Sequence, residues 1–372
     1  MIYLDNGATS FPKPQSVIRA VGRAVAHQGN PGRGGYPAAM EGAKTLYQCR
    51  ETAGKLFECE PEQVVLTANC TQGLNMAIRT LVRPGDRVVI SGFEHNAVTR
   101  PLHLLGTEVL PAGRRLFDWE NTLEEFEKAL ERRPAAAVFT HMSNVFGYIL
   151  PVEEMAALCR GRGIPFVLDA AQSAGVLEVS LKGLGAAFVA MPGHKGLLGP
   201  MGTGLLLCGR LPAVWMAGGT GSDSIRQAMP EFLPDRGEAG TANVPGAAGL
   251  LAGMGEVRRL GLEHIARREA VCAARCAQGL EKLGVEVYAG PHQGGTVSFR
   301  TSMDCEAMAR ALERRGFALR AGLHCAPMAH ESAGTLETGT VRASFGRHAD
   351  PAQADALVGA VGDVMKKYRR ED

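Results

Sequence analysis

Short apolar runs alternate with amphipathic stretches through the first two-thirds of the chain. Six of these runs read as strands buried on both faces, at positions 64–68, 87–93, 135–142, 165–171, 186–191 and 202–208. Between several of them the apolar positions follow a helical period, at 72–82, 123–132 and 151–162. This alternation predicts an α/β fold with a mainly parallel sheet covered by helices on both faces. In such sheets, ligands bind beyond the carboxyl ends of the strands.

The pattern changes in the last third of the chain. The Ala- and Arg-rich segment 246–283 predicts one or two extended helices. Beyond it the periodicity predicts a small α+β unit, with strands at 285–289, 296–301, 317–320 and 340–345 and helices at 305–315 and 351–368. We therefore expect a large domain over 14–250 and a small domain formed by 1–13 and 251–372.

The composition argues against several classes of protein. The chain has 372 residues, of which 45% are hydrophobic and 21% charged, as in an ordinary globular protein. Its 40 basic and 38 acidic residues give a net charge of +2 with no basic block, so we expect no nucleic acid or membrane partner. The apolar stretches fall well below the roughly 18 residues of a membrane span, and the first residues lack the apolar core of a signal peptide. We expect a cytoplasmic protein.

Nine cysteines are scattered along the chain without CxxC pairs. This spacing suits a reducing compartment, where most cysteines are small, buried and inert. A claim for a reactive cysteine must therefore rest on its local surroundings.

Polar residues follow several of the predicted strands. The sequence Asn-Cys-Thr-Gln-Gly at 69–73 comes after the first strand and opens a helix, where free backbone N–H groups and the Thr71 hydroxyl can hold a phosphate. Thr71 could equally be a helix N-cap. His95 follows the second strand, where its flat ring could stack on a planar cofactor or could be an ordinary partly buried histidine.

Two further strand ends carry the most informative pair of residues. Asp169 ends a hydrophobic strand, where a buried carboxylate needs a cationic partner such as a protonated pyridine nitrogen. A structural ion pair or a helix cap would be the alternative. Lys195 lies among glycines and apolar residues, which favours a desolvated, reactive amine. Together they predict a pyridoxal 5′-phosphate (PLP) site with a Schiff base on Lys195.

The small domain adds a cysteine and two arginines. Cys325 lies in a loop bounded by Gly322 and Pro327, next to His324 and after Arg320, an electropositive setting that activates a thiol. Arg342 lies within an apolar strand, where its planar guanidinium could bind a substrate carboxylate.

These residues together resemble the class V aminotransferase superfamily of fold-type I PLP enzymes, and within it the cysteine desulfurase and selenocysteine lyase branch. The match runs from Tyr-Leu-Asp-Asn-Gly-Ala at 3–8 to Arg-Ala-Ser-Phe at 342–345. The resemblance implies a large domain with a mainly parallel seven-stranded sheet, a small α+β domain and a homodimer. It also implies that L-cysteine is converted to L-alanine while Cys325 becomes a persulfide.

The resemblance also implies roles for single residues. Lys195 would form the Schiff base and move the Cα proton, Asp169 would pair with the pyridinium nitrogen, and His95 would stack on the ring. Gln172 would bind the ring oxygen of the cofactor, and the phosphate would be held by Thr71, Gln72, His194 and the neighbouring subunit's Thr241. Asn144 would contact the cofactor or the substrate, and Arg320 and Arg342 would bind the substrate.

The chain departs from relatives in the SufS-like group II enzymes at two places. Pro192 stands where many of them carry a phosphate-binding serine, and the stretch 29–35 replaces a motif that often contains histidine. Only 16 residues separate Cys325 from Arg342, which resembles the short catalytic loop of group II. Such a loop implies sulfur delivery near the mouth of the active site, to a dedicated acceptor protein.

Three alternatives stay open. Within PLP chemistry the chain could be a selenocysteine lyase, an aminotransferase or another lyase, although a transaminase has no need of Cys325. It could be a non-catalytic scaffold that keeps the fold for binding. His324, Cys325 and His330 could also bind a metal, but no fourth ligand lies at zinc spacing.

Overall fold

The computed structural model describes residues 1–32, 34–222 and 224–371. Its largest sheet has seven strands in the order β2-β8-β7-β6-β5-β3-β4. β8 runs antiparallel to both of its neighbours and all other pairs are parallel. The strands are β2 (Val64–Thr67), β3 (Arg87–Ser91), β4 (Glu108–Ala112), β5 (Ala136–Thr140), β6 (Phe166–Asp169), β7 (Phe188–Pro192) and β8 (Gly204–Cys208). The predicted α/β class and mainly parallel seven-stranded sheet are confirmed.

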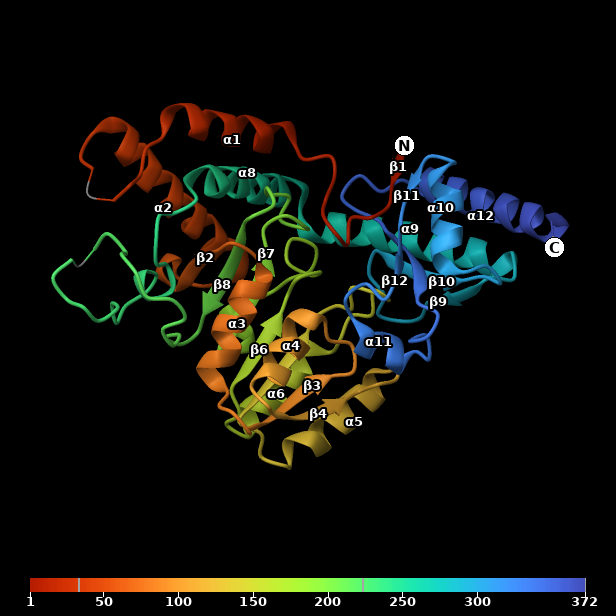
Figure 1. Ribbon diagram of the computed structural model, residues 1–372, viewed down its shortest axis with the longest axis horizontal. Coiled ribbons are helices and arrows are strands. Elements are labelled where there is room, and N and C mark those ends of the chain that lie inside the picture. Colours follow the sequence, from red (N-terminus) through yellow and green to blue (C-terminus); the bar gives the residue numbers. More distant parts are fainter. Residues whose placement is uncertain (33, 223, 372) are drawn as a thin grey trace.

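Helices cover both faces of this sheet (Figure 1). Successive strand residues point to opposite faces, so that Val88 and Ile90 pack with one set of helices and Val89 with the other. The first set is α3 (Cys70–Leu81) and α4 (Asn96–Leu104). The second set is α2 (Pro37–Phe57), α5 (Trp119–Leu130), α6 (Val152–Gly161), α7 (Leu181–Leu184) and α8 (Val244–Leu260). Burial on both faces explains why these strands are continuously apolar.

The remaining elements of this unit lie around the sheet. α1 (Gln15–His27) packs along α8, and short 3-10 turns occur at η1 (Pro61–Gln63) and η2 (Asp235–Gly237). Among the described residues, no helix is both long and apolar enough to cross a bilayer. Arg33, in the departing stretch 29–35, lies outside the described residues.

A second sheet forms the core of the smaller unit. It is antiparallel in the order β12-β13-β10-β9. Its strands are β9 (Glu286–Tyr288), β10 (Thr296–Arg300), β12 (Arg320–Gly322) and β13 (Thr340–Ser344), and its helices are α9 (Leu262–Lys282), α10 (Cys305–Glu313), α11 (Pro327–Ser332) and α12 (Pro351–Glu371). Near it, β1 (Ile2–Tyr3) pairs with β11 (Phe317–Ala318), so Leu4 joins the hydrophobic core of this unit. The division of the chain into a large domain over 14–250 and a small domain formed by 1–13 and 251–372 stays a prediction. Helix α8 crosses the boundary at residue 250 and packs with α1 and α2 of the larger unit.

Some boundaries differ from the expected ones. The segment 246–283 forms two helices, separated at Gly261, whose positive φ of 83° ends α8. The single strand expected at 317–320 is two strands in two sheets, because β11 pairs with the N-terminal strand while β12 pairs with β13. The sequence pattern also missed β1, β4, α1, α2 and α4; β4 and α4 carry internal prolines that weaken their signals.

Candidate active site

The polar residues that follow the parallel strands come together at the carboxyl edge of the large sheet. His95 follows β3, Asn144 follows β5, Asp169 ends β6 and Lys195 follows β7. They line one cavity, whose walls comprise Asn69, Cys70, Thr71, His95, Ala97, Thr140, Met142, Asn144, Asp169, Ala171, Gln172, Pro192, His194 and Lys195. The expectation that the site lies beyond the carboxyl ends of the strands is therefore met.

Asp169 is buried, with an exposed fraction of 2%. One of its oxygens, Oδ1, accepts hydrogen bonds from the backbone N–H of Ala171 (2.9 Å) and from the thiol of Cys70 (3.5 Å). Burial raises the pKa of Asp169, while these hydrogen bonds and the charge of Lys195 act in the opposite direction. No ion pair of Asp169 occurs within the described residues, so its carboxylate retains capacity for a cationic ligand atom.

Lys195 lines the same cavity as Asp169. Burial lowers the pKa of its ammonium group, and the positive charges of Arg342 and Arg320 act in the same direction. Across the part of the chain that the structure describes, its Nζ makes no hydrogen bond to another residue. A lysine in this state is suited to act as a neutral amine.

His95 forms another wall of the cavity as the N-cap of α4. Its Nδ1 accepts a hydrogen bond from the backbone N–H of Ala97 (3.0 Å), which leaves the ring proton on Nε2. Burial and the charge of Lys195 lower the pKa of His95 to about 4, so the ring is neutral at physiological pH. The preceding residue, Glu94, is fully buried and was not singled out by sequence reasoning; burial raises its pKa to about 8.

The N-terminal segment 5–13, called here the N-terminal strap, lies across the cavity wall. The carbonyl of His194 accepts hydrogen bonds from the backbone N–H of Ser10 (3.1 Å), the hydroxyl of Thr9 (3.0 Å) and the ammonium of Lys13 (2.7 Å). The side-chain amide of Gln172 donates to the carbonyl of Gly7 (3.1 Å). The strap therefore fixes two residues that were predicted to bind the cofactor.

The residues predicted to bind the phosphate do not all line the same cavity. Thr71 is exposed in the first turn of α3, where the side chain of Asn69 caps the backbone N–H of Gln72 (2.8 Å). The side-chain oxygen of Gln72 accepts from the N–H of Ala68 (2.8 Å). Gln72 and Thr241 line a different, larger cavity and not that of Lys195. Pro192 lines the Lys195 cavity without offering a donor.

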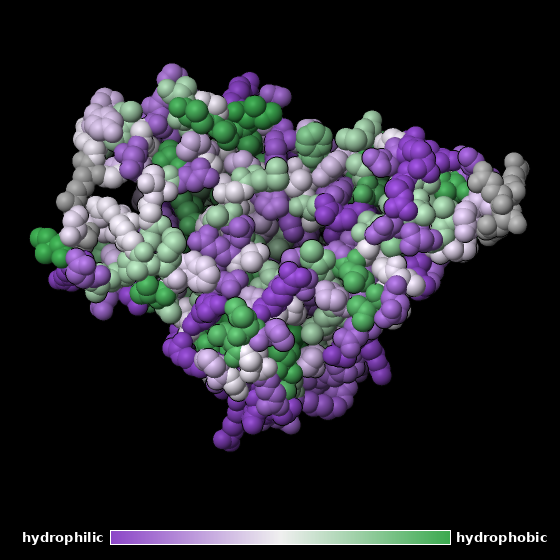
Figure 2. Space-filling model, in the orientation of Figure 1, coloured by the Kyte–Doolittle hydropathy of each residue, from purple (hydrophilic) through white to green (hydrophobic). Residues whose placement is uncertain are grey.

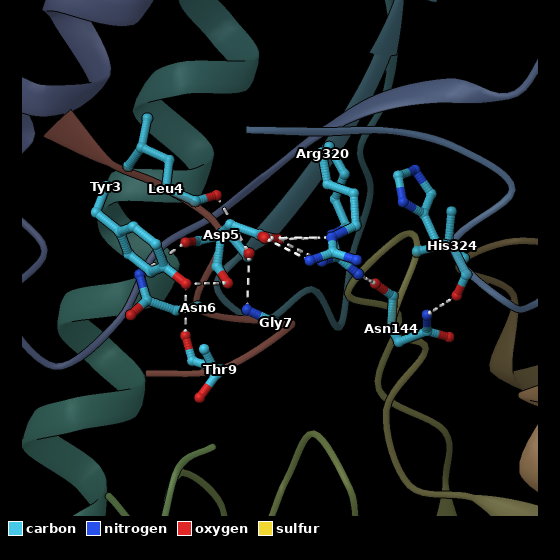
Figure 3. A network of polar contacts seen from close by, with 12 residues as sticks. Tyr3, Leu4, Asp5, Asn6, Gly7, Thr9, Asn144, Arg320 and His324 are labelled. Atoms are coloured by element: carbon cyan, nitrogen blue, oxygen red, sulfur yellow. Dashed lines mark hydrogen bonds and ion pairs between the residues drawn. The ribbon is translucent and has the colours of Figure 1, made fainter. Parts of the chain in front are cut away.

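The two predicted substrate arginines share a carboxylate that sequence reasoning missed. Arg320 and Arg342 lie directly opposite each other on β12 and β13. Asp5 pairs with both, with 2.8 Å from its Oδ1 to Nη2 of Arg342 and 2.9 Å from its Oδ2 to Nη2 of Arg320. Figure 3 shows the pair of Asp5 and Arg320. Arg342 also donates to the backbone carbonyl of Asn144 (2.9 Å), which connects the arginines to the cavity wall.

All nine cysteines lie in the described part of the chain, and Cys325 is the exposed one among them. His324 and Cys325 have positive φ values of 50° and 57°, which strain residues with side chains. The loop is held at two points: the side-chain amide of Asn144 donates to the carbonyl of His324, and the N–H of Asn96 donates to that of Cys325, both at 2.8 Å. The loop of Cys325 is thus connected to Asn144, which lines the cavity, and to Asn96, which follows the cavity residue His95.

Comparison with known families decides where this arrangement belongs. The model of the aminotransferase class-V family matches residues 2–357. The chain belongs to this family. The resemblance inferred from its motifs is therefore confirmed at the level of the family.

Three similar proteins are named as cysteine desulfurases or probable cysteine desulfurases. A probable cysteine desulfurase from Methanothermobacter thermautotrophicus is 32% identical, with 92% of this chain and 90% of the relative covered. The apo structure of a cysteine desulfurase from Thermococcus onnurineus superposes with a TM-score of 0.91 at 30% identity, covering 98% and 95% of the two chains. The cysteine desulfurase CsdA from Escherichia coli gives a TM-score of 0.85 at 25% identity, covering 98% and 94%.

Class-V aminotransferases use PLP, and the cavity fits this cofactor. Asp169 is a buried carboxylate without an ionic partner among the described residues, and Lys195 is a partly buried amine without a hydrogen bond there. A pyridinium nitrogen and an imine would satisfy these two groups respectively. His95 offers a flat neutral ring, and Thr71 and His194 offer polar groups at the same cavity.

The histidines beside Cys325 are engaged within this class-V fold. His324 Nε2 donates to the carbonyl of Thr340 (3.2 Å), and His330 Nδ1 bonds with the hydroxyl of Thr335 (2.7 Å). In residues 1–32, 34–222 and 224–371, no three or more His, Cys, Asp or Glu side chains are grouped to hold a metal ion. The structure therefore gives the metal hypothesis no support.

Proposed function

We propose that this chain is a PLP-dependent cysteine desulfurase that transfers the sulfur of L-cysteine to Cys325 and releases L-alanine. The observation that carries the proposal is the double role of Asn144. It lines the cavity of Lys195 and Asp169, and its amide holds the loop of the exposed cysteine. A cofactor site and an accessible thiol are thereby joined through one residue.

The residues of the large unit would prepare the substrate. When bound, PLP withdraws electrons from the substrate's Cα, which labilises the Cα proton and then the Cβ–S bond. The Nζ of Lys195, whose pKa burial lowers, would take and return the Cα proton. Asp169 holds a positive charge on the ring nitrogen, and the neutral ring of His95 packs against the cofactor face.

The residues of the smaller unit would complete the reaction. Arg342 and Arg320 attract the substrate carboxylate, and Asn144 orients it. The thiolate of Cys325 attacks the substrate sulfur, an S–S bond forms and the Cβ–S bond breaks. The electron pair of the broken bond stays on Cβ, which takes up a proton, so that cysteine and the enzyme thiol become alanine and an enzyme persulfide.

Several observations favour this reaction over an aminotransferase or a different lyase. The relatives named above are called cysteine desulfurases. A transaminase needs no thiol, whereas this chain holds Cys325 exposed on a strained backbone beside Arg320. Selenocysteine would use the same residues, so relative rates with the two amino acids would separate a desulfurase from a selenocysteine lyase.

The proposal is tested by product analysis with L-cysteine and a reducing thiol. The wild type should release alanine and sulfide in equal amounts. Cys325→Ala should lower both by about a hundredfold, because the nucleophile is lost. Cys59→Ala, which removes a half-buried thiol, is the matched control and should leave both rates unchanged. A wild type that makes neither product, or a Cys325→Ala variant as fast as wild type, would show the proposal to be wrong.

We also propose a homodimer and a sulfur acceptor protein. Large apolar side chains are exposed on α1, at the start of α2 and in the segment 209–242, including Ile18, the α2 N-cap residue Tyr36, Met40, Trp215 and Phe232. Figure 2 shows apolar residues over α1 and at the outer end of that segment. Exposed apolar patches of this kind favour protein contacts. Thr241 lies next to this surface and away from the cavity of its own Lys195, as expected if it serves a second subunit. A monomeric mass by light scattering would contradict the dimer.

A further inference from the structure

The backbone carbonyl of His194 is the point where the N-terminal strap meets the cavity of Lys195. It accepts four hydrogen bonds, from the N–H of Ser10 (3.1 Å), the hydroxyls of Thr9 (3.0 Å) and Ser10 (3.2 Å), and the ammonium of Lys13 (2.7 Å). A carbonyl oxygen has two lone pairs, so these donors compete for it. Lys13 makes the shortest of these contacts and is the charged donor among them. Because charge-assisted hydrogen bonds are about twice as strong as neutral ones, we expect Lys13 to contribute most to this contact.

This carbonyl belongs to the peptide group that leads into Lys195. The side chains of His194 and Lys195 both line the cavity. The backbone of the preceding residue is closely packed as well, because a Cβ at Gly193 would collide with the hydroxyl of Thr203. A peptide held in this way fixes the point from which the Lys195 side chain starts. A displacement of the strap would therefore move two residues that are predicted to contact the cofactor.

Thr9 fixes the position of the strap itself. Its hydroxyl lies 3.2 Å from Nδ1 of His194, so that it contacts both the backbone and the ring of that residue. The hydroxyl of Tyr3 donates to the backbone carbonyl of Thr9 (2.9 Å), as Figure 3 shows. The ammonium of Lys13 donates to the hydroxyl of Ser10 (2.8 Å) as well as to the His194 carbonyl. Near His194 the strap is thus held by neutral hydrogen bonds and by one charged one, that of Lys13.

The surroundings of Lys13 supply no compensating negative charge. In the ranges 1–32, 34–222 and 224–371, no carboxylate lies within ion-pair distance of its Nζ. Arg347 is a neighbouring cation, whose guanidinium donates to the carbonyl of Pro12 (3.2 Å). The carboxylate of Glu256 acts on Arg347 and is itself paired with Arg259 (2.9 Å). Lys13 therefore lies in a setting that disfavours its charged form.

The charge of Lys13 changes at moderately alkaline pH. Burial and the positive charge of Arg347 lower its pKa to about 8. The ammonium is therefore present at pH 7 and largely lost at pH 9.5, where the neutral amine is a weaker hydrogen-bond donor. His194 keeps its charge state in this range, since burial and the charges of Lys195 and Lys13 lower its pKa to about 4. The hold of the strap on the His194 carbonyl should thus weaken as the pH rises through about 8.

We propose that Lys13 is a positioning residue for the cofactor site, whose ammonium holds the peptide between His194 and Lys195 and thereby slows the release of PLP. Lys195 is predicted to bind PLP covalently, and a side chain on a peptide that is free to move is placed less precisely. Three neutral donors to the His194 carbonyl remain when the ammonium is lost. The inference rests on PLP as the cofactor of this family and does not require that cysteine is the substrate.

Release of PLP from the purified holoenzyme at pH 7 and pH 9.5 tests the proposal. The holoenzyme is diluted, and the PLP that passes a protein-retaining membrane is measured over time by its absorbance. At pH 7, Lys13→Met should release PLP about tenfold faster than wild type, because a hydrogen bond to a charged group is lost. At pH 9.5 the wild type should approach the rate of Lys13→Met, since both then lack the ammonium. Lys128→Met changes an exposed lysine elsewhere and should match wild type at both pH values.

Lys13→Arg separates the charge of residue 13 from other effects of pH. A guanidinium stays charged at pH 9.5, so this variant should then release PLP about tenfold more slowly than wild type. Any pH dependence that it retains comes from other groups, such as Lys195, whose pKa is also lowered. Equal release from Lys13→Met and wild type at pH 7, or a wild type that stays tenfold slower than Lys13→Met at pH 9.5, would overturn the proposal. If Lys13→Met does not fold, equal release from Lys13→Arg and wild type at pH 9.5 would overturn it.

The release measurement contains no substrate, which keeps this inference apart from the proposed function. If the wild type makes no alanine from cysteine but Lys13→Met releases PLP faster at pH 7, the desulfurase proposal fails and the role of Lys13 stands. If alanine is made and the release of PLP does not depend on Lys13, the role of Lys13 fails alone.

Discussion

The cavity wall of the large unit and the arginine cluster of the small unit are built in different ways. His95, Asn144, Asp169 and Lys195 each lie within a few residues of the end of a parallel strand, so the order of the sheet brings them together. Asp5, Arg320 and Arg342 meet only because β12 pairs with β13 and the N-terminal strap lies beside them. The first region follows from local sequence and the second from long-range pairing.

The largest effect is expected from removing the amine of the cavity wall. Lys195→Ala should lower alanine formation by about a thousandfold or more, because the group that moves the Cα proton is lost. The visible absorbance of the lysine-bound cofactor should disappear as well, which a spectrum of the purified protein would check. Lys128→Ala changes an exposed lysine and should preserve both. Persistent visible absorbance in Lys195→Ala would show that another lysine holds the cofactor.

This contrast also explains how much the sequence could predict. Asp169 and Lys195 could be found because an isolated carboxylate or lysine in an apolar run is conspicuous and each follows a recognisable strand. The sequence predicts one strand over 317–320, whereas the structure has two strands in two sheets. The pairing of Arg320 with Arg342 could therefore not be predicted. Asp5 had no local signal, since its partners lie 315 and 337 residues away.

A substitution at Cys70 tests how much its hydrogen bond to Asp169 contributes to catalysis. Its thiol donates to Oδ1 of Asp169 and lies in the same cavity. Cys70→Ala should lower alanine formation about tenfold, because hydrogen bonds to charged groups are worth about 1.5–3 kcal/mol. Cys70→Ser keeps a donor and should recover most of the rate. Cys159→Ala removes a buried thiol elsewhere and serves as the control; equal rates in Cys70→Ala and wild type would assign Cys70 to packing alone.

The last effect concerns not catalysis but the stability of the small unit. Glu269 on α9 is buried, lines a cavity that reaches Lys195, and has a pKa raised to about 8 by burial. Between pH 5 and 8 the unfolded chain has lost this proton while the folded chain keeps it, so stability falls as pH rises. Glu269→Gln should be about 1–3 kcal/mol more stable than wild type at pH 8 and similar at pH 5.

Urea unfolding at the two pH values would measure this difference. Glu281→Gln changes an exposed glutamate on the same helix and should show no pH-dependent gain. A gain of equal size at pH 5 and pH 8 would mean that the substitution acts through packing and not through the proton.

The pairing of Asp5 with Arg320 and Arg342 also affects how the protein is made. During synthesis Asp5 leaves the ribosome early, while its partners follow 315 and 337 residues later. The large sheet ends at Cys208 and can assemble from the chain already released. The arginine cluster must wait until nearly the whole chain has emerged, because contacts of long sequence separation form late. The cavity wall that contains Asp169 and Lys195 can thus form long before the arginine cluster does.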